Sequence, residues 1–244
     1  MYAPSDTATR STGPDRSAAI IDVVVYLVAV VVFWGVEEWL RSIGRFPLPG
    51  LLDGAPSLVA SFFVVVALMK RRGQRWSDFG LVRPRRWWLV PAWGLVVMVV
   101  HVASQMTIVP LLSSLLHVPP PDFSKYDPLR GNLKLFLFVT PGAMITGGFI
   151  EEFVYRGMMF DRLARIVGGT GRRTVLAAAL LCGIPFGLAH FQWGVGGVLV
   201  TAVMGSMLGL MYLATRRNLW PLVFGHAALD FLLLLQVYLG VLKP

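Results

Sequence analysis

The stretch AAIIDVVVYLVAVVVFWGVEEWL, from Ala18 to Leu40, decides the fold class of this chain. It is long enough to cross the hydrocarbon core of a bilayer, which takes about 20 predominantly apolar residues. It is also too long for the apolar core of a signal peptide, and no evident cleavage site follows it. We therefore expect this stretch to remain in the protein as a membrane anchor.

Similar apolar runs recur to the end of the chain, which is 56% hydrophobic and only 14% charged. Soluble domains carry about 25% charged residues. We therefore predict an all-α fold, a polytopic transmembrane bundle of about seven helices. Met158–Gly169 mixes apolar and basic residues at helical spacing, which is typical of a helix lying along the membrane surface. The seven predicted spans are Ala18–Leu40, Pro56–Met69, Trp88–Leu116, Leu133–Phe153, Thr174–His190, Val195–Ala214 and Leu219–Leu242.

Three regions follow from the distribution of polar and apolar residues. Residues 1–17 are rich in Ser, Thr and Pro and are expected to form a disordered tail. Residues 18–130 hold the N-terminal spans, and residues 131–244 hold the spans that carry clustered ionisable groups. The segments expected on the N-terminal side of the membrane contain 16 of the 22 Lys and Arg residues. This asymmetry predicts a cytoplasmic N-terminus and a C-terminus on the other side.

The net charge of +9 does not indicate nucleic-acid binding, because the cations lie between apolar segments and no helix carries a basic face. They are expected to face lipid headgroups instead. Cys182 is the only cysteine and lies in an apolar run, so we interpret it as a packing residue. Gly205 and Gly209 form a GxxxG pattern, which favours close helix packing.

Ionisable side chains within apolar spans are expensive to insert and are therefore candidates for function. Glu151 and Glu152 end the fourth predicted span. On a helix, Glu152 and Arg156 are four residues apart in the order that favours an ion pair. Glu151 points elsewhere and is free to act as a general base. The same acids can simply mark a helix end in headgroup water, and Glu37 with Arg41 repeats the spacing without nearby histidines.

Two further clusters occupy the fifth and seventh predicted spans. Phe186 shares a helical face with His190, and His226 shares one with Asp230. An aspartate beside a histidine can fix the tautomer of the ring and favour its charged form. Taken singly, each cluster is also explained by packing or by a hydrogen bond between helices. Their joint occurrence favours a shared cavity.

The series EExxxR, FxxxH and HxxxD, in this order on successive spans, resembles the CAAX prenyl protease and bacteriocin-processing family, intramembrane glutamate proteases of the Abi type. The resemblance covers roughly Leu133 to Leu242 and includes the Asn-Leu-Trp sequence that begins at Asn218. Upstream it rests on hydropathy and on the stretch from Phe79 to Pro84. It implies that residues 131–244 form the catalytic part of the chain.

The resemblance also implies a role for each matching position. Glu151, aided by His190, activates a water molecule for attack on the scissile carbonyl. His226 and residue 230 stabilise the oxyanion, while Glu152, Arg156 and Phe186 support them. Many relatives have Asn at the last position, whereas an ionised Asp230 cannot donate a hydrogen bond. Asp230 is therefore expected to hold His226 as a cationic donor, unless the site keeps Asp230 protonated.

The expected function is hydrolysis of a peptide bond in a peptide or protein C-terminal tail, with a bacterial inner membrane as the expected location. No metal and no cofactor are expected, and the expected partners are a peptide or membrane-protein substrate and the lipid bilayer. A zinc-dependent protease is an alternative, although HExxH is missing. A non-catalytic scaffold, regulator or immunity factor and a proton-coupled transporter remain open as well.

One geometric difficulty accompanies this expectation. His190 lies 16 residues after Thr174, which is about 24 Å along a straight helix. If Arg172 and Arg173 mark the inner membrane face, His190 lies near the outer face. Glu151 ends the fourth predicted span and would then lie near the inner face. A tilted fifth helix or a bend in the fourth is needed to bring the two side chains together.

Overall fold

The computed structural model describes residues 15–46, 48, 50–169 and 171–242, and all regular secondary structure in them is helical. The longer helices are α1 (Arg16–Ser42), α2 (Ala55–Arg71), α3 (Leu89–Leu116), α4 (Leu133–Ala143), η4 (Met144–Met159), α5 (Phe160–Val167), α6 (Arg172–Leu181), α7 (Gly183–Leu188), α8 (Gly194–Ala214) and α9 (Trp220–Tyr238). The short turns are η1 (Gly50–Leu52), η2 (Trp76–Phe79), η3 (Ser124–Leu129) and η5 (Phe191–Trp193).

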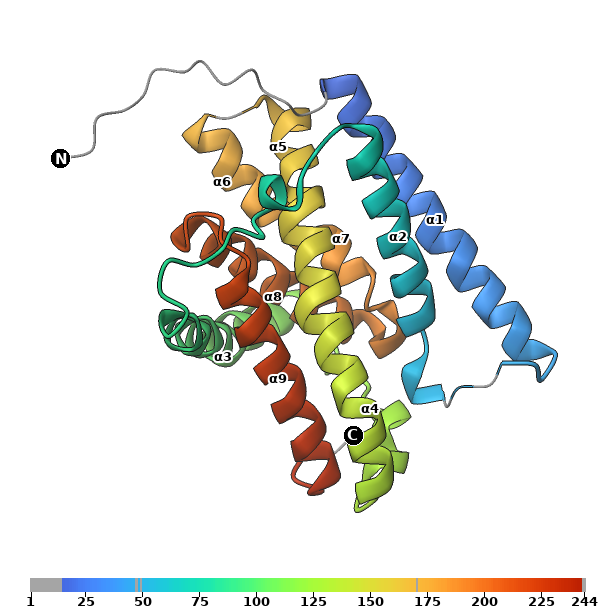
Figure 1. Cartoon of the computed structure of the whole chain (residues 1–244). Helices are drawn as coiled ribbons and strands as arrows, with labels where there is room; N and C mark the ends of the chain where they lie inside the picture. The colour runs from blue at the N-terminus through green and yellow to red at the C-terminus, as the bar shows by residue number, and fades with distance from the viewer. Residues whose placement is uncertain (1–14, 47, 49, 170, 243–244) are drawn as a thin grey trace.

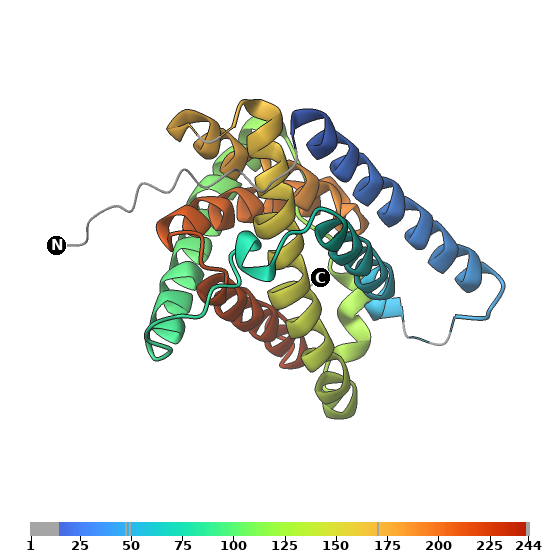
Figure 2. The same cartoon turned by 45° about the horizontal axis from the view of Figure 1, so that its top comes forward.

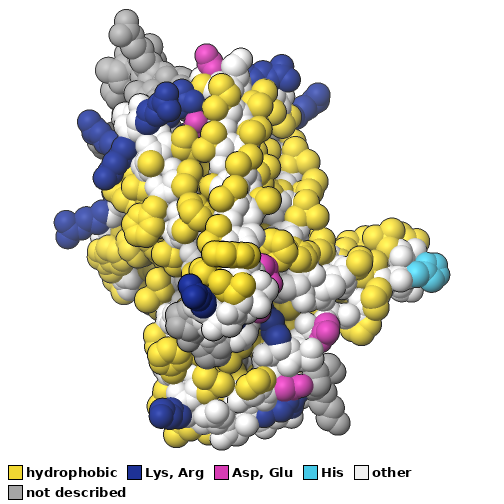
Figure 3. Space-filling view, turned by 90° about the vertical axis from the view of Figure 1, so that its right-hand side faces the viewer, with side chains coloured by type: hydrophobic (Ala, Val, Ile, Leu, Met, Phe, Trp, Pro, Cys, Tyr) yellow, Lys and Arg dark blue, Asp and Glu magenta, His cyan; other side chains and the backbone are white. Residues whose placement is uncertain are grey.

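Six helical segments in the described ranges are long and apolar enough to cross a membrane, and the chain is a polytopic all-α membrane protein. They are Arg16–Ser42, Gly50–Arg71, Leu89–Leu116, Leu133–Val167, Phe191–Ala214 and Trp220–Tyr238. The outward faces of these helices are apolar, as lipid contact requires. On α1, for example, Val24, Val28 and Val31 are exposed. Hydrophobic side chains cover the middle of the side shown in Figure 3, and Lys and Arg gather at its upper end.

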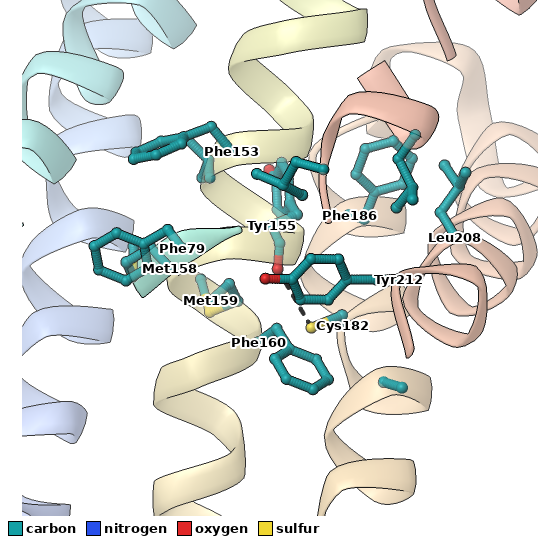
Figure 4. Packing of buried hydrophobic residues seen from close by; sticks show 14 of the residues in the cluster. Phe79, Phe153, Tyr155, Met158, Met159, Phe160, Cys182, Phe186, Leu208 and Tyr212 are labelled. Carbon is teal, nitrogen blue, oxygen red and sulfur yellow. Dashed lines mark hydrogen bonds between the residues drawn. The ribbon is translucent and has the colours of Figure 1, made fainter. Parts of the chain in front are cut away.

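The α4, η4 and α5 segments form one continuous helix through the centre of the bundle. It is 35 residues long, from Leu133 to Val167, and Glu151 lies near its middle. In Figures 1 and 2 it passes between α9 on one side and α2 on the other, and both helices contact η4. Phe79 and Phe153 pack on one side of this helix, with Phe186 and Leu208 on the other (Figure 4).

The prediction that the fourth span ends at Phe153 is therefore wrong, and so is the separate surface helix expected at Met158–Gly169. This segment continues the central helix, and α5 packs against α1 and α6. Arg156 and Arg162 misled the sequence interpretation because arginines usually mark loops. Both residues belong to the central helix, and their side chains are fully buried in the bundle. Neither of them therefore bears on membrane orientation.

The fifth predicted span is also absent as a single helix. Residues 172–188 are divided at Cys182 into α6 and α7, and Pro185 removes one backbone donor within α7. Both pieces lie very close to α8. A Cβ atom on Gly187 would lie 2.6 Å from the carbonyl oxygen of Val198, and one on Gly209 would lie 2.2 Å from that of Ala179. The close packing predicted from Gly205 and Gly209 is thus confirmed.

Two further predictions concern single segments. Cys182 is fully buried in the core, and its thiol lies 3.5 Å from the carbonyl oxygen of Tyr155 (Figure 4), which confirms a packing role. The disordered tail predicted over residues 1–17 falls mostly on residues 1–14, outside the described ranges. Its last residues belong to α1, whose first turn is capped by Asp15 through a 2.7 Å hydrogen bond from the Ala18 amide.

A buried charge network joins α1, α5 and the end of α2. The Asp22 carboxylate accepts hydrogen bonds from Arg162 Nε at 3.0 Å and from Arg72 Nη2 at 2.9 Å. Arg162 also donates to the side chains of Gln74 and Asp161. Because the side chains of Asp22 and Arg162 are both fully buried, each needs the other to offset the loss of hydration.

We predict that Asp22→Ala lowers the free energy of unfolding by about 3–5 kcal/mol, because it leaves the buried Arg162 guanidinium without its main counter-ion. Unfolding in mixed micelles, followed by tryptophan fluorescence, measures this loss. Glu38→Ala on the same helix is the matched control and should change stability by less than about 1 kcal/mol. Equal stability of the two variants would contradict the assignment.

Candidate active site

The residues singled out from the three sequence clusters meet where η4, α7 and α9 come together. Glu151 and Glu152 lie on η4, His190 follows α7, and His226 and Asp230 lie on α9. Two glycines of η4 permit this approach. A Cβ on Gly147 would lie 2.1 Å from Asp230 Oδ2, and one on Gly148 would lie 2.6 Å from Ala227 Cβ. Any larger side chain at these positions would push α9 away.

The predicted ion pair between Glu152 and Arg156 is present. Glu152 Oε1 and Arg156 Nη1 are 2.9 Å apart, and both side chains are fully buried. Arg156 also donates to the carbonyl oxygen of Gly205 on α8 at 3.2 Å, and its guanidinium lies 4.4 Å from the centre of the Phe186 ring. The pair therefore connects η4 with α7 and α8.

His226 lies among three carboxylates. Its Nδ1 is 2.7 Å from Glu152 Oε1, while its Nε2 is 3.9 Å from Glu151 Oε2 and 3.6 Å from Asp230 Oδ1. The short contact is a hydrogen bond in which Nδ1–H donates, since an ionised carboxylate can only accept. Glu152 was expected to pair with Arg156. Instead, the same oxygen also fixes the orientation of His226, and Asp230 lies beyond hydrogen-bond distance.

His190 is oriented by the backbone. Its Nδ1 lies 2.8 Å from the carbonyl oxygen of Phe186, so this nitrogen carries the proton and Nε2 faces the cavity. Nε2 is 4.0 Å from Glu151 Oε1. The imidazole is held between two aromatic rings, with its centre 4.9 Å from the centres of both Phe186 and Trp193. The aromatic neighbour expected at Phe186 is confirmed, whereas Trp193 was not foreseen.

The two halves of the cluster differ in accessibility. Glu152 and Arg156 are fully buried, whereas the side chains of Glu151, His190 and Asp230 are 15%, 13% and 23% exposed. Glu151 is therefore partly accessible, and it lies about 4 Å from both histidines. Contacts of this length are typically bridged by a water molecule.

The sequence suggested that Glu151 and His190 lie near opposite faces of the membrane. The length of the central helix removes this difficulty. Glu151 is not at the inner end of a span but in the middle of a helix that continues to Val167. The break at Cys182 and the short α7 then place His190 at the same level. The sequence alone could not show that Glu151 and His190 lie at the same level, because the arginines after Glu151 are typical of the start of a loop.

Several contacts that shape the site had no clear signal in the sequence. Tyr26 on α1 and Tyr155 on η4 bring their hydroxyl oxygens within 3.4 Å in the buried core. Asn218 organises the turn before α9, since its side chain accepts from the Trp220 amide and donates to the carbonyl oxygen of Val82. Gly80 approaches the same turn with a φ of +90°, which only glycine adopts readily.

The zinc alternative has no preformed ligand set in the described ranges. No group of three or more His, Cys, Asp or Glu side chains there has an arrangement that could hold a metal ion. His226 Nδ1 is already bonded to Glu152.

Residues 132–232 match the family model described as Rce1-like, type II CAAX prenyl endopeptidase. This part of the chain is similar to that family. The match begins just before α4, ends within α9 and contains all the clustered ionisable residues, which confirms the family resemblance seen in the sequence. Comparison with curated proteins and with solved structures gave no match. The Rce1-like family is a family of CAAX-type membrane proteases, and its substrates are peptides or proteins.

We predict that Gly148→Ala destabilises the protein by about 1–3 kcal/mol, because the added methyl group overlaps the Cβ atom and the backbone of Ala227 on α9. Gly142→Ala is the matched control, since its Cβ would meet no atom within 4 Å. It should be neutral or stabilising by up to about 1 kcal/mol. The free energy of unfolding in micelles distinguishes them, and a neutral Gly148→Ala would contradict the close approach of η4 and α9.

Proposed function

We propose that this chain is an intramembrane endopeptidase that hydrolyses a peptide bond in the C-terminal tail of a peptide or membrane protein. Residues 131–244 would form the catalytic part, and the helices in residues 18–130 would complete its surroundings. The observation that carries the proposal is the position of Glu151. It is partly accessible, it lies about 4 Å from two histidine nitrogens of fixed orientation, and it forms no ion pair with an arginine in the described part of the chain.

In this mechanism a water molecule lies between Glu151 and His190. Both groups are acceptors, because the proton of neutral His190 is on Nδ1, where it bonds to Phe186. They therefore orient the two water protons and leave the oxygen lone pairs directed at the substrate carbonyl. The water oxygen bonds to the carbonyl carbon while Glu151 takes its proton. When the carbon–nitrogen bond breaks, Glu151 returns this proton to the leaving amine.

His226 would stabilise the negative oxygen that forms on the carbonyl carbon. Its Nδ1–H is bonded to Glu152, so a second proton on Nε2 makes that nitrogen a cationic donor directed at the cavity. Arg156 and a protonated His226 then balance two of the three carboxylates. Glu152 is the group that holds His226 in place, and Asp230 has the secondary role of lining the oxyanion position.

Glu151→Gln should reduce peptide cleavage by about 10²–10⁴-fold, the usual contribution of a general base. The measurement is cleavage of tail peptides by purified protein in liposomes, read by mass spectrometry. Glu38→Gln is the matched control and should retain wild-type cleavage, and strong chelators should leave the rate unchanged. Cleavage that persists in Glu151→Gln would contradict the role of Glu151 as the general base. Loss of activity with a chelator would favour the zinc alternative. If wild type cleaves nothing, a scaffold role is favoured.

Asp230→Asn should keep cleavage within about tenfold of wild type, because the asparagine amide can donate to the oxyanion and Glu152 still holds His226. Removal of a needed oxyanion donor would instead cost about 10²–10³-fold. Comparison of kcat for wild type, Asp230→Asn and Asp230→Ala separates these cases. Complete loss in Asp230→Asn would show that the negative charge itself is required.

A further inference from the structure

An apolar groove lies between the first turns of α3 and α9, away from the proposed active site. The two helices touch where a Cβ on Gly225 would lie 2.8 Å from the carbonyl oxygen of Gly94. On the N-terminal side of this contact the groove has a volume of about 340 Å³, within the usual range for ligand pockets. Its lining is entirely uncharged and includes Val90 of α3 and Val223 and Ala227 of α9.

Two tryptophans form the mouth of this groove. The rings of Trp87 and Trp220 lie 5.4 Å apart, and Trp87 is about half exposed. The neighbouring Trp88 is more exposed still. Indole side chains are enriched at the level of the lipid headgroups. The mouth of the groove is therefore expected at the headgroup level, with its apolar floor extending into the hydrocarbon.

Two arginine-rich segments meet at the same mouth. The loop that leads into α3 runs beside the turn before α9 (Figures 1 and 2), because the Leu219 amide donates to the carbonyl oxygen of Gly80 and the Asn218 side chain donates to that of Val82. The exposed cations of the two segments are Arg83, Arg85, Arg86, Arg216 and Arg217. Neither residues 83–88 nor residues 215–220 include an acid.

Most of these cations have no partner within the part of the chain that the structure describes. Arg217 lies over the Phe160 ring, with 5.2 Å between its guanidinium and the ring centre. The side chains of the other four form no ion pair or hydrogen bond with any described residue. Arg216 also has a φ of +56°, a backbone conformation that glycine adopts more readily. The mouth thus carries positive charge that the described residues do not balance.

An apolar groove with a cationic mouth fits a ligand that has an anionic head and a hydrocarbon chain. Guanidinium groups bind phosphate through paired hydrogen bonds. Basic pockets between transmembrane helices bind the headgroups of anionic lipids for this reason. A neutral apolar ligand would use the groove but would leave the arginines without a counter-ion.

We propose that this groove binds an anionic phospholipid. Its phosphate is held by Arg85, Arg86 and Arg216, and one acyl chain lies between α3 and α9. The chain reaches Ala227, which also packs against Gly148 of η4, so the bound lipid supports the contact between α9 and the central helix. This site does not depend on the proposed function, because the lipid binds whether or not the protein cleaves peptides.

The test uses lipids whose acyl chains carry bromine, which quenches the fluorescence of any indole that it contacts. Full-length protein in neutral micelles is titrated with phosphatidylglycerol or with phosphatidylcholine of identical brominated chains. Wild type should bind phosphatidylglycerol about 10- to 100-fold more tightly, since each arginine near the headgroups contributes about fivefold. Trp87→Phe combined with Trp220→Phe should remove most of the quenching that is specific to phosphatidylglycerol.

Two variants test the head and the chain separately. Replacement of Arg85, Arg86 and Arg216 together by Gln should abolish the preference for phosphatidylglycerol. Val223→Phe should fill the groove and weaken the quenching by both lipids. Because the two lipids are compared in the same variant, a partly destabilised protein still reports the preference.

The matched control replaces Arg71, Arg172 and Arg173 by Gln, which makes the same change in net charge away from the groove, and it should keep the preference. Equal binding of the two lipids by wild type, or equal loss of preference in both triple variants, would overturn the site. So would specific quenching that persists without Trp87 and Trp220. If a prenylated peptide displaces both lipids from these tryptophans equally well in wild type and in the groove triple variant, the groove holds a substrate tail instead.

Discussion

The ion pair between Glu152 and Arg156 lies where neither lipid nor water reaches it, and much of the C-terminal half of the chain is arranged around it. Two charges removed from water in this way must satisfy one another, because an unpaired buried charge is strongly destabilising. Arg156 reaches the backbone of α8 and the Phe186 ring, and Glu152 reaches His226 on α9. Four elements therefore depend on one pair of side chains, and the accessible Glu151 is positioned as its immediate neighbour on η4.

Two further charge networks fix α1 to the rest of the bundle, one at each end of that helix. Asp22 binds Arg162 and Arg72 at one end, and Glu37 binds Arg41, Ser57 and the Gly54 amide at the other. Hydrophobic burial does not drive helix association in a bilayer, since lipid is as apolar as the side chains. Polar contacts and close backbone packing take its place, as the glycines of η4 and α8 show.

The sequence was sufficient to predict the helical fold, the Glu152–Arg156 pair, the contact of Phe186 with His190 and the family. These features depend on apolar length and on spacing of three or four residues along one helix. It did not predict the bond between Glu152 and His226, the contact of the Trp193 ring with His190 or the close approach of Gly147 to Asp230. Those contacts join residues from different helices, and no local pattern records them.

The error in the fourth predicted span has a clear physical origin. Arg156 and Arg162 were interpreted as loop residues because isolated arginines are costly in a membrane, but each is paired with a buried carboxylate. An arginine with a buried partner can belong to the interior of a helix. The long central helix was not predicted for this reason. The division of α6 from α7 has a different setting, since it lies at Cys182, next to the short α7 that contains Pro185.

The hydrogen bonds that hold the two histidines by Nδ1 also make the proposed site asymmetric. Rotation of either ring would leave a carbonyl or a buried carboxylate without its donor, so the Nε2 atoms keep their places. In the proposed mechanism, a bound peptide bond would meet the base, Glu151, on one side and the donor, His226, on the other. Only one face of its carbonyl would then be open to attack, so the substrate chain could run through the site in a single direction.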